Sequence, residues 1–184
     1  MKTLLLLLLS CTPAWAADYK VGERLPAAAA DKPAHYKEVT WDDLLPKGWD
    51  PMQAIKDLKL DKLKDSDPRA VEAMAKLRSM WNEAPANPAI QGRPVRIAGF
   101  MVPLESGRQE VKEFLLVPYF GACIHVPPPP ANQIIHVLPE RPVKTKGVMD
   151  AVWVSGVIEL ASSRTDMGDS GYRLRAKKVE PYKE

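Results

Sequence analysis

The sequence predicts an α+β fold that is mainly β, and three features support this class. The C-terminal half alternates apolar and polar residues with a period of two, which is typical of strands. The N-terminal half holds one amphipathic helical segment whose apolar residues recur every three or four positions. The 18 prolines and 10 glycines of the 184-residue chain favour short elements and frequent turns.

The first 16 residues are expected to be a cleaved signal peptide. Lys2 is followed by the apolar run Leu4 to Leu9 and by Ala14-Trp15-Ala16, where a signal peptidase can cleave. The run is too short to span a bilayer, which takes about 20 residues. Residues 8–11 partly resemble a lipoprotein signal, so lipidation at Cys11 is the less favoured alternative. We therefore expect a periplasmic protein with no transmembrane segment in the mature chain.

Residues 17–37 are predicted to be a flexible leader, and residues 38–90 a helical N-terminal region. The region begins with a short helical turn that Thr40 or Asp42 can cap. Pro46 ends this turn because proline cannot continue a helix.

Two further helical segments are predicted in the N-terminal region. A short one runs from Asp50 through Leu60, with Pro51 at its first position. The stronger one runs from Asp67 to Asn82, where Asp67 is the N-cap and proline follows it. Its apolar stripe is interpreted as a packing face and consists of Val71, Met74, Leu77 and Trp81.

Residues 91–184 are predicted to form five strands, which cover residues 95–102, 113–117, 133–138, 148–160 and 172–179. Gly99 and Gly156 mark points where a strand can bend. Residues 106–107 are predicted as a turn and residues 163–171 as a polar loop. Short strands with glycine bends and no long helix between them favour a small OB-like five-stranded antiparallel barrel. An open antiparallel sandwich is the alternative.

The charge pattern argues against nucleic acid as a partner. Loss of Lys2 with the signal peptide leaves 25 of the 26 basic residues beside 23 acidic ones. The two signs are interspersed and form no long block, which is typical of a solvated surface and not of a nucleic-acid footprint.

Residues 118–136 hold two of the three histidines and the single cysteine that remains after cleavage. Cys123 and His125 are two positions apart, so on an extended chain they project to the same side. A thiolate and an imidazole can bind zinc, and His136 becomes a third ligand if the loop folds back. Three interpretations stay open here: a buried cysteine beside a hydrogen-bonded histidine, a metal site, and a redox or nucleophilic thiol.

The same segment contains a candidate binding loop. Four consecutive prolines favour a stiff polyproline II strut, and they are Pro127, Pro128, Pro129 and Pro130. Asn132 and Gln133 can close the following turn by bonding backbone groups, and Tyr119 precedes the strut. The loop is interpreted either as a ledge on which a partner docks or as a rigid connection between two strands.

The stretch from Pro118 to Gln133 resembles the signature of the DUF3299 family, which comprises small exported bacterial proteins of uncharacterised function. Four further segments resemble the family pattern, and they cover residues 41–46, 96–105, 113–117 and 171–174. The resemblance therefore extends over nearly the whole mature chain.

The resemblance implies a periplasmic accessory protein of a transport system. Members of the family are often encoded beside ABC transporter components of the macrolide-exporter type, and some of these clusters belong to zinc-starvation responses. The family's Cys and His carry over to Cys123 and His125, whereas the position that matches His136 is often aromatic.

We therefore expect a non-enzymatic accessory or binding protein, linked to zinc handling or to an ABC transporter and its inner-membrane permease. A thiol- or metal-dependent enzyme that uses Cys123 and His125 is one alternative. A structural docking protein that uses the polyproline loop is the other.

Overall fold

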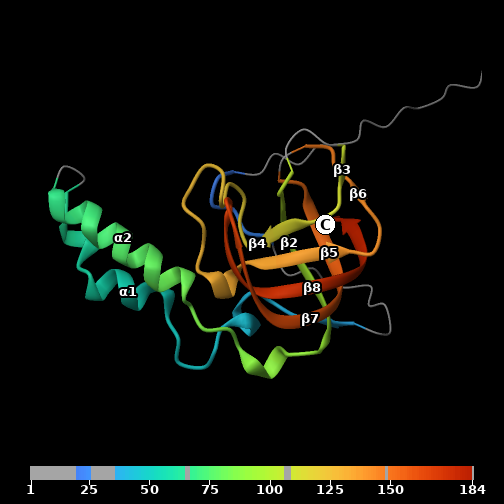
Figure 1. Ribbon diagram of the computed structural model, residues 1–184, viewed down its shortest axis with the longest axis horizontal. Helices are drawn as coiled ribbons and strands as arrows, with labels where there is room; N and C mark the ends of the chain where they lie inside the picture. The colour runs from blue at the N-terminus through green and yellow to red at the C-terminus, as the bar shows by residue number, and fades with distance from the viewer. Residues whose placement is uncertain (1–19, 26–35, 65–66, 106–108, 148, 184) are drawn as a thin grey trace, which may run out of the picture.

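The protein consists of a β body from which a pair of helices projects, as the computed structural model in Figure 1 shows. The structure describes residues 20–25, 36–64, 67–105, 109–147 and 149–183. The predicted signal peptide, Cys11, most of the predicted leader and the predicted turn at residues 106–107 lie outside this part of the chain. No helix in the described ranges is long and apolar enough to cross a membrane.

The β body is built on a six-stranded sheet with the order β1-β2-β4-β5-β8-β7. Its strands are β1 (Lys37–Glu38), β2 (Pro94–Pro103), β4 (Phe114–Val117), β5 (Ile135–Pro139), β7 (Ala151–Thr165) and β8 (Gly168–Pro181). A separate two-stranded sheet pairs β3 (Glu110–Val111) with β6 (Val143–Lys144). The prediction of a mainly β fold with few helices is confirmed.

The strand directions differ from the predicted all-antiparallel arrangement of five strands. The six-stranded sheet is mixed, because β1 runs parallel to β2 and β5 runs parallel to β8. The remaining pairs are antiparallel. The prediction of five antiparallel strands is therefore wrong in both number and direction. A two-residue strand from the N-terminal segment adds the sixth member, and the return of β8 beside β5 adds a parallel pair.

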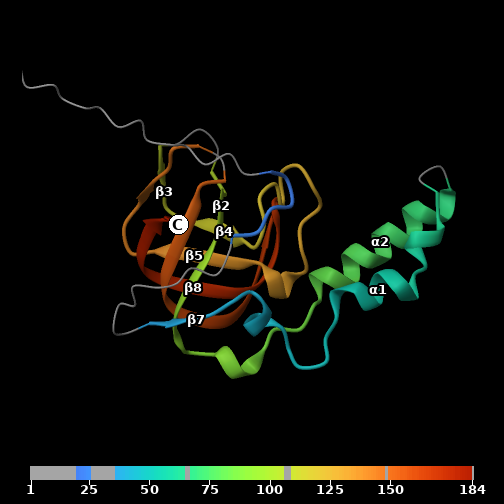
Figure 2. The ribbon, with the colours of Figure 1, turned by 180° about the vertical axis from the view of Figure 1, so that it is seen from behind.

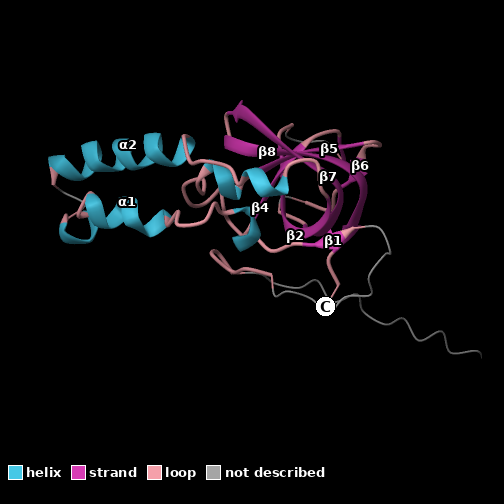
Figure 3. Cartoon of the chain, turned by 90° about the horizontal axis from the view of Figure 1, so that it is seen from below, coloured by secondary structure: helices cyan, strands magenta, loops and turns pink. Residues whose placement is uncertain are grey.

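The strand pairings also form a circuit. β2 pairs with β7 from Pro94 to Phe100 and with β4 from Phe100 to Pro103. The succession β2, β4, β5, β8 and β7 therefore returns to β2, and the strands curve around a shared interior in Figure 3.

The two glycines that were predicted as bends lie where other atoms come close. A Cβ on Gly99 would lie 2.8 Å from the carbonyl oxygen of Val117, next to the residue at which β2 changes partner. A Cβ on Gly156 would lie 2.1 Å from the carbonyl oxygen of Arg175, at a register shift between β7 and β8. Both positions therefore require a residue without a side chain.

Buried side chains form two clusters, one on each side of β4. Phe114 and Leu116 point into the inner cluster, which also contains Tyr172 and side chains of β2, β5, β7 and β8. Leu115 and Val117 point into an outer cluster. This outer cluster also contains Ala122 and Ile134, so the segment that follows β4 covers the outer face of the strand.

The two main helices begin where their caps predicted. Helix α1 (Pro51–Asp57) is capped by the Asp50 side chain, which accepts from the N–H of Met52 at 2.8 Å. Helix α2 (Pro68–Asn82) is capped by Asp67, which accepts from the N–H of Arg69 at 2.9 Å. In both helices a proline occupies the first turn, where its missing N–H has no intrahelical partner to lose.

The described residues also form four short 3-10 helices, which are η1 (Asp42–Leu44), η2 (Leu60–Lys62), η3 (Pro88–Ile90) and η4 (Ala131–Gln133). The predicted turn before Pro46 corresponds to η1. Thr40 stabilises this turn, because its N–H and hydroxyl both donate to the Asp43 carboxylate, at 2.8 and 2.9 Å.

The predicted polar loop at residues 163–171 is wrong. β7 continues to Thr165 and β8 begins at Gly168, so most of these residues extend a long hairpin. The Thr165 hydroxyl donates to the carbonyl of Gly168 at 2.7 Å and closes the turn. Sequence alone suggested a loop because this end of the hairpin extends beyond the apolar interior and its residues are mostly polar.

Candidate functional site

The segment after β4 forms a compact turn where an extended chain was expected. The carbonyl oxygen of Gly121 accepts hydrogen bonds from three successive N–H groups, those of Ile124, His125 and Val126, at 3.3, 2.9 and 3.2 Å. Cys123 adopts a left-handed backbone conformation with φ of 66°. The geometric premise for placing the Cys123 and His125 side chains on one side of a strand is therefore absent.

Cys123 is half-buried and packs against the outer cluster, as do Tyr119, Phe120 and Ile124. Burial raises the pKa of its thiol from 9.0 to about 12. Burial is also the main cause that raises the pKa of Tyr119. The thiol is accordingly protonated at neutral pH, whereas metal ligation and nucleophilic attack both need the thiolate.

The two candidate histidines occupy different environments. His125 is exposed on the turn. His136 is buried in β5, and its Nε2 lies 2.9 Å from the Glu113 carboxylate. The other ring nitrogen of His136, Nδ1, is buried and has no hydrogen-bond partner.

The structure does not bring the three candidate zinc ligands into one cluster. Within the described ranges, no group of three or more His, Cys, Asp and Glu residues is placed to hold a metal ion. Zinc binding by Cys123, His125 and His136 therefore remains a prediction from the sequence.

The polyproline segment is exposed at its start and buried at its end. Pro127 is exposed and Pro128 is half-buried, whereas Pro129 and Pro130 are buried. Pro130 has φ of −55° and ψ of 149°, which is the polyproline II region. Only the first two prolines of the predicted binding loop are thus available to a partner.

The two amide side chains that follow the prolines bond a distant part of the chain. Asn132 donates to the carbonyl of Pro85 at 3.0 Å, and Gln133 donates to the carbonyl of Trp41 at 2.8 Å. Both side chains are buried. Their role is therefore to attach the N-terminal region to the β body.

Tyr172 completes this attachment, and sequence reasoning placed it only at the start of a strand. Its hydroxyl donates to the carbonyl of Leu44 at 2.6 Å and accepts from the N–H of Asn87 at 2.5 Å. The Tyr172 hydroxyl loses solvent on burial, and this raises its pKa. A buried tyrosine needs a hydrogen-bond partner, but the sequence does not say which backbone group provides it.

We call Asn132, Gln133 and Tyr172 the clamp. Its bonds reach residues 41–44 and residues 85–87, which lie on either side of the helical pair in sequence. The clamp therefore fixes both ends of one segment to the same end of the β body.

We call that segment, residues 50–82, the arm. Figures 1 and 2 both show α1 and α2 side by side and extending away from the strands. Six large hydrophobic side chains are exposed within the described ranges, and four of these lie on the arm: Met52, Val71, Met74 and Met80. Exposed apolar surface is thus concentrated on the part that projects.

The interpretation of the α2 stripe as a packing face holds for only half of its residues. Leu77 is buried and Trp81 is half-buried, but Val71 is 72% exposed and Met74 is 44% exposed. The reason is that α1 is only seven residues long and covers one narrow face of the fifteen-residue α2. Sequence periodicity identifies an apolar stripe and does not show what covers it.

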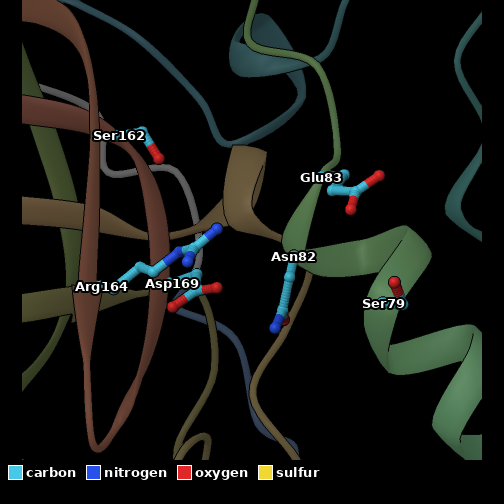
Figure 4. A pocket seen from close by; sticks show the side chains of 6 residues that line it. All are labelled: Ser79, Asn82, Glu83, Ser162, Arg164 and Asp169. Carbon is cyan, nitrogen blue, oxygen red and sulfur yellow. The ribbon is translucent and has the colours of Figure 1, made fainter.

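A polar groove of about 450 Å³ separates the end of α2 from the β7–β8 hairpin. Figure 4 shows its lining side chains, which are Ser79, Asn82 and Glu83 on the helix side and Ser162, Arg164 and Asp169 on the hairpin side. Sequence reasoning missed this groove, because the hairpin residues were interpreted as a loop.

Comparison with known proteins places the chain in a family. Residues 41–181 match the family model described as a protein of unknown function, DUF3299. The chain belongs to the DUF3299 family. The matched range contains the arm, the clamp and the segment around Cys123.

A solved DUF3299 structure is similar to this DUF3299 protein over most of its length. It is the crystal structure of a DUF3299 family protein from Pseudomonas aeruginosa PAO1, with 32% sequence identity and a TM-score of 0.63. The alignment covers 82% of this chain and 99% of that chain. No curated protein matches the sequence. The comparisons therefore establish family and fold, and they leave function to be argued from the site.

Proposed function

We propose that this DUF3299 protein is a non-enzymatic periplasmic accessory protein that binds a partner protein through its arm. The observation that carries the proposal is the exposure of Met52, Val71, Met74 and Met80 on the arm. Val71 and Met74 are three positions apart and share one face of α2. Exposed apolar side chains on one face are typical of interaction surfaces, and methionine adapts its shape to a partner.

The chemistry of the arm favours an amphipathic helix that carries a carboxylate. Arg78 follows Met74 by four positions, so the two side chains share one face of α2 with Val71. Arg78 is exposed and makes no ion pair within the described part of the chain. A partner with an apolar stripe and one acidic residue would complement this face.

The charge of the arm supports a protein partner over a lipid surface. Residues 50–82 contain seven basic and six acidic residues. Binding of a helix to an anionic membrane surface draws on an excess of Lys and Arg, which the arm does not have. The resemblance to proteins encoded beside macrolide-exporter-type transporters supports the choice of an inner-membrane permease as the partner.

We also infer that the circuit of five strands is an OB-like barrel to which β1 is added. The support is that β2, β4, β5, β8 and β7 pair in a closed succession. In such a barrel the curved sheet is a rigid body that presents attached segments. Fold analogy alone assigns no ligand to it.

Binding to a purified macrolide-exporter-type permease of the source organism tests the function. The double variant Val71→Ser/Met74→Ser removes apolar area that would be buried at the interface. We expect at least a tenfold rise in Kd, since loss of about 1.4 kcal/mol corresponds to a factor of ten.

The matched control is Glu72→Ser/Lys76→Ser on the same helix, at two exposed polar positions. This variant should bind within about twofold of wild type, a factor that corresponds to less than 1 kcal/mol. Equal Kd values for wild type and for Val71→Ser/Met74→Ser would remove the arm as the docking surface. Circular dichroism checks that both variants keep their helices.

A further inference from the structure

The groove between α2 and the β7–β8 hairpin contains charged side chains that form no ion pair with a described residue. Arg164 and Asp169 are partners in the β7–β8 register, so their side chains lie on the same face of the hairpin. Neither they nor Glu83 forms an ion pair within the described ranges. Further along the same two strands, Arg175 and Glu159 do pair, at 3.0 Å.

The two walls of the groove complement opposite charges. On the hairpin wall, Arg164 presents a guanidinium that can bind a carboxylate through two parallel hydrogen bonds. On the helix wall, Glu83 lies just after α2, where the helix dipole adds negative charge. Asp169 adds a second carboxylate below Arg164, as Figure 4 shows. The lining thus offers one site for an anion and a region of excess negative charge for a cation.

The composition of the groove excludes two other ligand classes. One arginine against two carboxylates gives the lining a net charge of −1, which disfavours phosphate and nucleotide ligands. The lining contains no aromatic side chain, so there is no face on which a sugar ring or a nucleobase could stack. Polar groups remain, including the Asn82 amide and the Ser79 and Ser162 hydroxyls.

We propose that the groove binds a small zwitterion, such as an amino acid or a short peptide. Its carboxylate would bind Arg164, and its ammonium group would lie near Asp169 and Glu83. The volume of about 450 Å³ falls within the range of 300 to 1,000 Å³ that small-molecule sites occupy. This inference goes beyond the proposed docking function, because the groove includes Ser79 and Asn82 at the end of the arm but neither Val71 nor Met74.

The clamp supports a preformed site. Asn132 bonds the carbonyl of Pro85, two positions after Glu83, and Ala84 between them is buried. The hairpin wall is held by the regular pairing of Arg164 with Asp169. Both walls belong to backbone that is already fixed, so binding has to order only side chains such as the exposed Arg164 and Glu83.

Calorimetric titration of the full chain with triglycine tests the proposal. Two blocked probes accompany it: N-acetyltriglycine, which lacks the ammonium group, and triglycine amide, which lacks the carboxylate. We expect saturable binding of triglycine and at least a tenfold weaker binding of each blocked probe. A parallel titration with glycine separates an amino-acid site, which binds it as well as triglycine, from a peptide site.

Two variants connect the binding to named residues. Arg164→Gln should weaken triglycine binding to the level of triglycine amide, because the guanidinium that recognises the carboxylate is gone. Glu83→Gln should reduce the difference between triglycine and N-acetyltriglycine. The matched control is Arg141→Gln, an exposed arginine of the β5–β6 loop outside the groove, which should leave all Kd values unchanged.

Three results would overturn the assignment. One is the absence of saturable triglycine and glycine binding at millimolar concentration. The second is equal affinity for the blocked and unblocked probes. The third is an unchanged Kd in Arg164→Gln while circular dichroism shows the variant to be folded. A loss of permease binding in the arm variant alone leaves this proposal standing, because Val71 and Met74 do not line the groove.

Discussion

Replacement of Tyr172 by phenylalanine isolates the contribution of the clamp, because it removes one hydroxyl and keeps the ring. That hydroxyl joins the carbonyl of Leu44 to the N–H of Asn87, at 2.6 and 2.5 Å. Tyr172 and Leu44 are both fully buried. A buried polar group left without a partner costs about 1–3 kcal/mol. The variant leaves two such groups, the buried carbonyl of Leu44 and the partly buried N–H of Asn87. We expect Tyr172→Phe to lower the free energy of unfolding by about 2–3 kcal/mol.

Urea denaturation measures this loss, and the matched control is Tyr36→Phe. Tyr36 is half-buried and makes no hydrogen bond among the described residues, so its replacement should change stability by less than about 0.5 kcal/mol. Hydrogen exchange adds a local readout, since the amide of Asn87 should lose protection in Tyr172→Phe. Equal stabilities of the two variants would refute the clamp as an energetic connection.

Three other outcomes are expected. The first concerns the Cys123 thiol, measured in a Cys11→Ser background. At pH 8 it should react with iodoacetamide about 1,000-fold more slowly in the native than in the unfolded chain, because its pKa rises from 9.0 to about 12. Comparable rates would contradict its burial. The same raised pKa contributes to the free energy of unfolding, fully below pH 9 and less and less from pH 9 to 12. In urea titrations the free energy of unfolding of wild type should therefore fall by about 1.4 kcal/mol more than that of Cys123→Ala between pH 8 and pH 10. Gly156→Ala should lower the free energy of unfolding by more than about 3 kcal/mol, because its Cβ would lie 2.1 Å from the Arg175 carbonyl oxygen. At Gly147 a Cβ would have no atom within 4 Å, so the control Gly147→Ala should be nearly neutral. Similar melting temperatures for the two variants in thermal denaturation would count against the close approach.

The elements that sequence predicted well are those whose cause is local. Asp50 and Asp67 each precede a proline and cap a helix, and the structure begins both helices there. Alternation of apolar residues located β2, which is buried on alternate positions over its first half. Such features depend on neighbours within a few residues, so the chain order alone specifies them.

The elements that sequence missed depend on contacts between distant residues. The parallel pairing of β5 with β8 joins Ile135 to Tyr172, 37 positions apart. The clamp joins Gln133 to Trp41 and Tyr172 to Leu44 across even longer separations. No local pattern encodes which backbone carbonyl a buried side chain will reach.

The candidate site shows the same division. Sequence singled out the segment around Cys123 as a candidate site, and the structure shows it as a turn in which three N–H groups converge on the carbonyl oxygen of Gly121. It did not reveal that Cys123 adopts a positive φ, which ends the extended geometry on which the Cys–His pairing depended. It also assigned Asn132 to a binding loop, whereas the side chain is buried in the clamp.

The attachment of the arm gives this protein a modular construction. The two stems that lead into and out of the arm touch each other, since the Asn87 side chain donates to the carbonyl of Asp43 at 2.9 Å. A segment whose entry and exit adjoin can be shortened, lengthened or exchanged without moving the strands that carry it. Evolution or a protein engineer could therefore alter the arm while the β body keeps its register.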